Sequence, residues 1–296
     1  ADRVVLIVKI EEQPTGELSF GAGYSTSEGV IGDISVTERN LMGKGQYVRL
    51  GFSGSLERAQ VDFSFTEPRF LGRNLAAGFD LFHKEVDFSS IASFRERNTG
   101  GNLRLGFPIA NNTQLGLRYR LEREEIYDVK SNASLAVKES EGEAFVSSVG
   151  YTVAYDTRNI PQSPTQGIFV SFSQDFAGVG GDVNYLRQVT DTRGYYPITN
   201  KITAVGRLQG GYIAGWGGED IRMTDLFFKG GETIRGFERA GIGPRDACQS
   251  PTTGKRINNC TKDPLGGQAF WASTAEARFP IPFLPDAIGL QGAVFV

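Results

Sequence analysis

The residues with the clearest chemical potential lie in a long connection near the C-terminal end of the chain. Ile234, Arg235, Gly236 and Phe237 sit inside segment 217–266, which separates two strand-like runs. Loops this long are uncommon in compact domains unless they have a function. Arginine keeps its charge and needs a carboxylate wherever it is buried. The motif therefore predicts a loop folded back into a polar cavity. The alternative is a mobile surface loop with an incidental arginine.

Two cysteines, Cys248 and Cys260, lie in the same segment. They lack the spacing of a zinc site and have no histidine nearby, so we expect no metal. A disulfide between them would indicate an oxidising compartment, whereas two free thiols would suit the cytosol. The single histidine, His83, falls in a strand pattern, where we expect a structural role. With so little material for a nucleophile and its base, we expect neither an enzyme nor a cofactor.

The composition excludes several classes of partner. The 296 residues carry a formal net charge of −3 without a basic block or stripe, which argues against nucleic acid. The longest aliphatic run, residues 4–8, is far too short for a transmembrane helix. Length alone permits one large β domain or two ordinary ones.

From residue 14 onward, apolar and polar residues alternate in successive runs. One run places Leu115, Leu117 and Tyr119 opposite Gln114 and Arg118. This period of two predicts about thirteen antiparallel strands of about 10 residues, long enough to cross a bilayer at a tilt. Short and longer connections also alternate, as in outer-membrane barrels.

The charged residues fall on one face of these strands. A basic residue facing hydrocarbon at the bilayer midplane costs roughly 2–4 kcal/mol, so we expect that face to line a watery channel. The fold class is therefore all-β, an antiparallel transmembrane β-barrel, with a soluble β-sandwich as the alternative. Because bacterial barrels have an even strand number and must close, we expect about three further strands beyond Val296.

Several motifs carry a resemblance to a known superfamily. Residues 234–237 resemble the Val/Ile-Arg-Gly-Phe/Tyr motif in the sixth extracellular loop of outer-membrane β-barrel assembly factors and related two-partner secretion transporters. Residues 38–45, 66–72, 155–159 and 164–167 are similar to the BamA branch in particular. The resemblance covers nearly the whole chain. It implies a sixteen-stranded barrel (residues 14–296 here) in the bacterial outer membrane, preceded by POTRA domains, of which residues 1–13 would be the end.

The resemblance also implies roles for individual residues. Arg235 would reach into the channel toward Glu276 and toward an aspartate falling just past Val296. Gly236 and Phe237 would pack the finger, residues 234–237, against the wall, and the cysteines resemble a loop disulfide of some members. The first strand would form a lateral seam with the last strand; its gate residues are Leu18, Ser19, Phe20, Gly21, Ala22, Gly23 and Tyr24. The glycines of this strand suit either a weakly held edge or packing against the finger.

The implied function is the folding and insertion of unfolded outer-membrane proteins, which would add strands at the open seam. Accessory assembly lipoproteins and outer-membrane lipids, including lipopolysaccharide, would be the other partners. A two-partner-secretion-type or translocation-assembly transporter is the alternative. The finger motif disfavours an ordinary porin.

Overall fold

The described residues form one antiparallel sheet in a computed structural model that covers residues 14–25, 28–231, 233–249, 252–253, 255, 257–281 and 290–296. The strands, in chain order, are β1 (Gly16–Ser25), β2 (Gly29–Leu41), β3 (Gln46–Ser55), β4 (Arg58–Glu67), β5 (Ala76–Asp87), β6 (Arg95–Ala110), β7 (Thr113–Tyr127), β8 (Gly142–Asp156), β9 (Gly167–Ala177), β10 (Tyr185–Pro197), β11 (Thr203–Gly215), β12 (Ala269–Pro280) and β13 (Gln291–Phe295). Three short helices accompany them: η1 (Phe70–Gly72), α1 (Leu135–Glu139) and η2 (Met223–Asp225). None of the described helices is long and apolar enough to cross a membrane.

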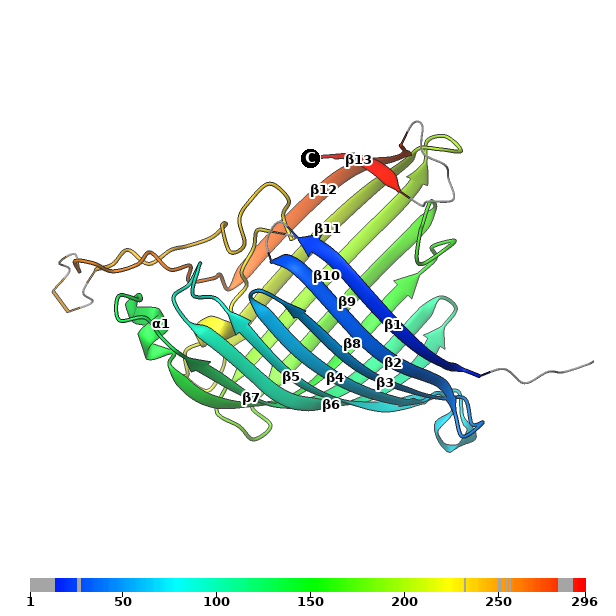
Figure 1. Ribbon diagram of the computed structural model, residues 1–296, viewed down its shortest axis with the longest axis horizontal. Coiled ribbons are helices and arrows are strands. Elements are labelled where there is room, and N and C mark those ends of the chain that lie inside the picture. The colour runs from blue at the N-terminus through cyan, green and yellow to red at the C-terminus, as the bar shows by residue number, and fades with distance from the viewer. Residues whose placement is uncertain are drawn as a thin grey trace, which may run out of the picture.

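The thirteen strands follow one another in space as they do in the sequence, and the sheet curls into an open barrel wall (Figure 1). β1 pairs only with β2, and β13 pairs only with β12, so the described sheet has two free edges. The predicted antiparallel barrel architecture and strand number are confirmed. The proposed POTRA tail, residues 1–13, lies outside the described residues and stays a prediction.

The two faces of the sheet have opposite chemistry. On the outer face, apolar side chains remain open to the surroundings, with Phe20 70% and Leu117 40% exposed. On the inner face, ion pairs bridge the strands: Arg104 lies 2.6 Å from Asp80, and Arg118 Nε donates to Asp175 at 2.7 Å. A soluble sandwich would bury the apolar face, so that alternative is wrong for this chain.

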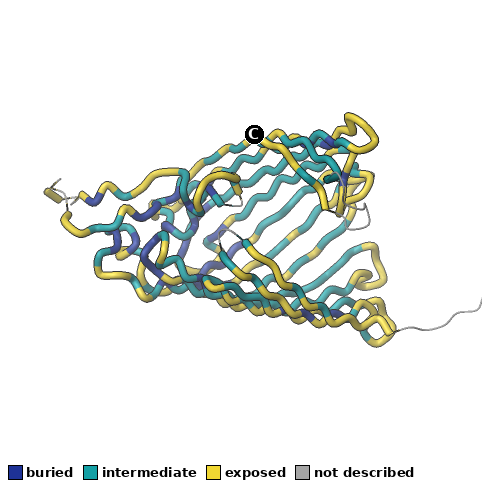
Figure 2. Tube along the Cα trace, turned by 45° about the horizontal axis from the view of Figure 1, so that its top comes forward, coloured by how far each residue is buried: buried dark blue, intermediate teal, exposed yellow. Residues whose placement is uncertain are grey.

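The buried core lies at the end of the barrel that carries the long loops (Figure 2). Met223 and Phe227 both belong to the connection between β11 and β12. Met223 lies in one buried cluster with Ile126 of β7, and Phe227 lies in another with Ile213 of β11. The long connection therefore folds over the barrel mouth and supplies much of its hydrophobic core.

Candidate functional site

The long connection enters the barrel through an aromatic anchor at its first turns. Phe227 exchanges two backbone hydrogen bonds of 2.9 Å with Gly267, and its ring lies 4.8 Å from that of Phe270 on β12. Arg187 of β10 stacks over Phe227 at 4.7 Å, and Lys229 lies over Phe270 at 3.5 Å. Burial lowers the pKa of the Lys229 ammonium group. These contacts fix the position of residues 227–229, which lead directly into the finger.

A tight turn then reverses the chain. Gly230 has a φ of +124°, and a Cβ at this position would lie 2.0 Å from the carbonyl oxygen of Glu238, so only glycine fits. Thr233 Oγ1 donates to the Gly230 carbonyl at 2.7 Å and accepts from the Gly230 N–H at 3.0 Å. The backbone N–H of Gly231 donates to the Phe237 carbonyl at 2.8 Å, which closes the base of the finger.

Arg235 points from this turn to the inner wall of the barrel. Its Nη2 lies 2.5 Å from Glu276 Oε2 on β12, and the other oxygen of Glu276 accepts from Arg278 Nε at 2.6 Å. The Arg235 guanidinium also lies 3.5 Å from the centre of the Phe295 ring on β13. The Glu276 side chain is only 10% exposed, against 41% for Arg235. The largely buried carboxylate of Glu276 therefore accepts hydrogen bonds from two arginines, Arg235 and Arg278.

The finger borders a cavity of about 290 Å³ on the inner faces of β10 to β12. Its charged lining consists of Arg193, Arg207, Arg235, Arg278 and Glu276. Asp191 accepts from Arg193 and from Arg207, each at 2.7 Å, beside this cavity. Four guanidinium groups therefore face two carboxylates, and the excess of positive charge suits one more anionic side chain.

The other finger residues lie differently from the expectation. Gly236 has a φ of +91°, as a tight reversal requires, but a Cβ there would meet no atom within 4 Å. Phe237 leaves 56% of its surface exposed, so the expected packing of Gly236 and Phe237 against the wall is not what the structure shows. Ile234 is half-buried. The anchoring comes instead from Arg235 and from the aromatic pair at the base.

The residues that the resemblance assigns to a gate occupy β1, with Leu18, Phe20 and Tyr24 on the outer face and all three exposed. Gly21 faces inward, and a Cβ there would collide with the carboxylate of Asp33 on β2. Gly23 has no atom within 4 Å of that position. The close neighbour of Gly21 is therefore the adjacent strand, not the finger. Ser19 and Ala22 complete this strand segment.

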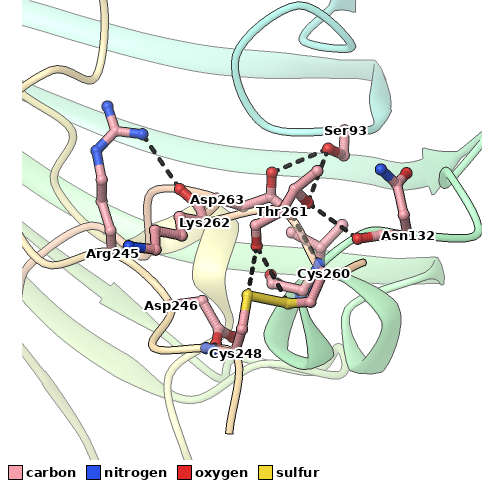
Figure 3. The surroundings of a disulfide bond; sticks show 11 residues. Ser93, Asn132, Arg245, Asp246, Cys248, Cys260, Thr261, Lys262 and Asp263 are labelled. Atoms are coloured by element: carbon pink, nitrogen blue, oxygen red, sulfur yellow. Dashed lines mark hydrogen bonds between the residues drawn. A yellow bond between two sulfur atoms is a disulfide. The ribbon is translucent and has the colours of Figure 1, made fainter. Parts of the chain in front are cut away.

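A disulfide joins Cys248 to Cys260, with 5.7 Å between their Cα atoms (Figure 3). It lies beside Thr261, whose backbone N–H donates to the carbonyl of Asn132 at 2.8 Å. By the chain-entropy estimate, a crosslink closing so short a loop contributes about 3 kcal/mol. The disulfide thus stiffens the part of the long loop that contacts the loop between β7 and β8.

Asp263 is a buried carboxylate at the barrel mouth that the sequence did not single out. Its side chain is buried and accepts from Ser93 Oγ at 2.9 Å (Figure 3). It also accepts from the backbone N–H of Ser134 at 2.8 Å. Thr261 Oγ1 also donates to it, at 2.7 Å. One carboxylate therefore ties together three loops at the barrel mouth. No local motif marks it, because its partners lie far away in the sequence.

His83 lies on β5 and forms a cross-strand contact. Its Nδ1 is 2.7 Å from Thr99 Oγ1 on β6, and its Nε2 is 3.6 Å from Glu85. These contacts within the sheet agree with the structural role expected for His83.

Comparisons with known proteins agree with this architecture. Residues 40–296 match the family described as Omp85 superfamily domain. The chain is 34% identical over 261 residues to outer membrane protein assembly factor BamA of Nitratidesulfovibrio vulgaris, covering 86% of this chain and 32% of that protein. The chain thus spans about a third of the length of this relative.

Two solved structures show the same fold. The crystal structure of BamA from Haemophilus ducreyi lacking POTRA domains 1–3 aligns with a TM-score of 0.83 at 24% identity, over 96% of this chain and 57% of that one. CdiB from Acinetobacter baumannii aligns with a TM-score of 0.53 at 14% identity, over 91% of this chain and 46% of that one.

Proposed function

Because the chain belongs to the Omp85 superfamily, we propose that it forms the membrane-embedded barrel of an outer-membrane protein assembly factor. The observation that carries the proposal is the Arg235–Glu276 contact, which holds a loop from the barrel mouth against the inner wall. An assembly factor needs a barrel whose wall is kept in one shape while an edge is exposed.

The proposed mechanism is physical and uses the free edge of β1. An edge strand presents unpaired backbone N–H and C=O groups, and an incoming strand can pair with them. Among the described strands, β1 pairs only with β2, so its other edge is free. Its outward side chains are exposed on the face that we assign to lipid. In the closed barrel this edge would meet the last strand. Opening that lateral seam would let an unfolded outer-membrane protein add its strands one by one and leave directly into the bilayer.

The finger would support this seam from inside. Arg235 contacts Glu276 on β12 and the Phe295 ring on β13, so it joins the last two described strands through one side chain. Four guanidinium groups of the cavity face two carboxylates, which supports a further carboxylate partner for Arg235. The finger would thus set the position of the strands that precede the seam.

Replacing Arg235 tests the proposal in cells that depend on the full-length protein. We expect Arg235→Ala and Glu276→Lys to lower the amount of assembled outer-membrane protein several-fold. Arg235→Lys should give an intermediate loss, because an ammonium group keeps the charge but not the fork of donors. The readout is the level of folded outer-membrane proteins, normalised to the level of the variant itself.

Arg123→Ala provides the matched control. Arg123 pairs with Glu143 on the outer face of the rim, and its side chain is 47% exposed, close to the value for Arg235. This substitution should leave assembly unchanged. Wild-type levels of outer-membrane proteins in both Arg235→Ala and Glu276→Lys would refute the proposed function.

The transporter alternative shares the finger and the general fold. Its structural support is weaker, since CdiB aligns with a TM-score of 0.53 against 0.83 for BamA. A dedicated transporter would lower the export of one protein when Arg235 is replaced and leave general outer-membrane protein levels intact. Measuring both quantities in the same cells separates the two functions.

A further inference from the structure

A second cavity opens on the outside of the wall, at the rim opposite the long loops. It has a volume of about 770 Å³ and lies where the β2–β3 and β4–β5 turns meet. Phe65, Phe79 and Leu103 form its apolar side, and Lys44 and Arg69 lie at its rim. By the loop-length rule for outer-membrane barrels, this rim faces the periplasm. The proposed assembly function uses none of these residues.

The apolar side of the groove is continuous with the lipid-facing wall. Phe65 and Phe79 lie on neighbouring strands with ring centres 5.6 Å apart, and Leu103 on β6 is 61% exposed beside them. The outward positions of β4 to β6 carry these three side chains. In a membrane-spanning barrel this surface is in hydrocarbon, so the part of a ligand that lies here must be apolar and elongated.

The rim of the groove carries more cationic than acidic side chains. Lys44, Arg69 and Arg73 are exposed, and none of them forms an ion pair within the described residues. One carboxylate, that of Glu67, also lines the groove and accepts from Gln46 Nε2 at 2.7 Å and from the backbone N–H of Arg69 at 3.0 Å. Two cationic side chains of the lining, Lys44 and Arg69, thus accompany one anionic side chain. This net positive charge favours an anionic group in the part of a ligand that lies at the rim.

Two apolar side chains stand exposed on the same turns. Leu71 is 77% exposed and Met42 is 81% exposed, and both have a φ of +55°. Non-glycine residues adopt this left-handed backbone at an energetic cost. At a membrane interface, exposed side chains of this kind can contact acyl chains next to cationic groups. Apolar and basic residues mixed in this way are typical of an interfacial lipid contact.

From this combination we infer that the groove binds an anionic phospholipid of the periplasmic leaflet. The phosphate-containing headgroup lies against Lys44 and Arg69, and one acyl chain runs along Phe65, Phe79 and Leu103. The inference rests on the membrane location of the barrel and does not require the assembly activity. A protein segment is a poorer fit, because half of the groove lies at the depth of the hydrocarbon.

Native mass spectrometry of the purified full-length protein tests this inference. The protein is titrated with dioleoylphosphatidylglycerol or with dioleoylphosphatidylcholine, and the retained lipid is counted. We expect phosphatidylglycerol to be retained preferentially. The double variant Lys44→Gln/Arg69→Gln should lose this preference by about 30-fold, which corresponds to about 1 kcal/mol for each removed charge. Inorganic phosphate at millimolar concentration should not displace the lipid, because it lacks the acyl chain.

The control variant is Lys138→Gln/Lys255→Gln, which removes two exposed charges on the side of the long loops. It should retain phosphatidylglycerol as the wild type does. Leu103→Thr should weaken both lipids to the same degree, since it changes only the acyl contact. Equal retention of the two lipids by the wild type, or equal losses in the two double variants, would overturn the inference. Either outcome is independent of the assembly test, because no substrate protein is present.

Discussion

At the scale of single residues, a buried carboxylate in the long loop affects how stably that loop docks in the barrel mouth. Asp225 lies in η2, almost completely buried, and its Oδ2 has no hydrogen-bond partner among the described residues. Burial raises the pKa of Asp225 to about 6; Glu122 and Glu96 act in the same direction, while Arg222 and Arg187 oppose it. Ionisation of Asp225 therefore destabilises the docked conformation of the loop.

The sign of this effect predicts a pH dependence of loop docking. The folded pKa is above the ordinary value of 3.8, so the contribution of Asp225 to stability is complete below about pH 4 and is lost as the pH rises through about 6. The full difference is about 3 kcal/mol at 1.36 kcal/mol per unit. Hydrogen exchange of segment 223–231, corrected for intrinsic rates, should show stronger protection at pH 5 than at pH 7.5.

Asp225→Asn removes the titrating group and keeps the shape of the side chain. The difference in protection of segment 223–231 between pH 5 and pH 7.5 should be smaller in this variant than in the wild type. An undiminished pH dependence in Asp225→Asn would assign the effect to another group. Glu124 of β7, which accepts from Arg222 of the long connection at 3.1 Å, would then be the next carboxylate to replace.

At the scale of elements, β1 is the strand on which the lateral seam depends. Every strand from β2 to β12 is paired on both sides, whereas β1 is paired on one. A photoreactive amino acid at Phe20 should therefore crosslink to an outer-membrane protein that is being assembled. The adduct is detected by its mass on a denaturing gel.

Leu117 is the matched position for this experiment. It faces the lipid side like Phe20, but β7 is hydrogen-bonded to both β6 and β8. The same photoreactive residue there should yield no adduct with the substrate protein. Equal adduct yields at the two positions would mean that substrates reach the outer wall without pairing at the β1 edge, contrary to the proposed mechanism.

The elements also show what a sequence reveals and what it hides. The strands were predictable because side chains alternate with a period of two in any strand, so Leu115 and Arg118 report the two faces locally. The closure of the barrel mouth was not predictable, because it depends on contacts between residues far apart in the sequence. Ser93 and Asp263, for example, are 170 residues apart. The five-residue helix α1 escaped as well, since a single turn is too short to show helical periodicity.

At the scale of the whole molecule, the sheet has two faces that suit two different solvents, hydrocarbon outside and water inside. The finger contact Arg235–Glu276 was expected from a motif resemblance, and the structure brings the two side chains within 2.5 Å. The exposure of Phe237 could not have been anticipated, because it depends on how the finger is oriented in three dimensions. The inner ion pairs and the open apolar outer face arise from the same alternation in all strands.

The outer face should therefore reject a charge that the inner face accepts. Leu117 lies on the outer face of β7, and in a bilayer Leu117→Arg should lower the free energy of unfolding by roughly 2–4 kcal/mol. Gly106 lies on the inner face of β6, paired with Gly116 next to Leu117, and a Cβ there would meet no atom within 4 Å. Gly106→Arg should change stability by less than about 0.5 kcal/mol. Urea titrations of the full-length protein folded in lipid vesicles would measure both values, and equal losses would mean that the two faces do not contact hydrocarbon and water as the structure requires.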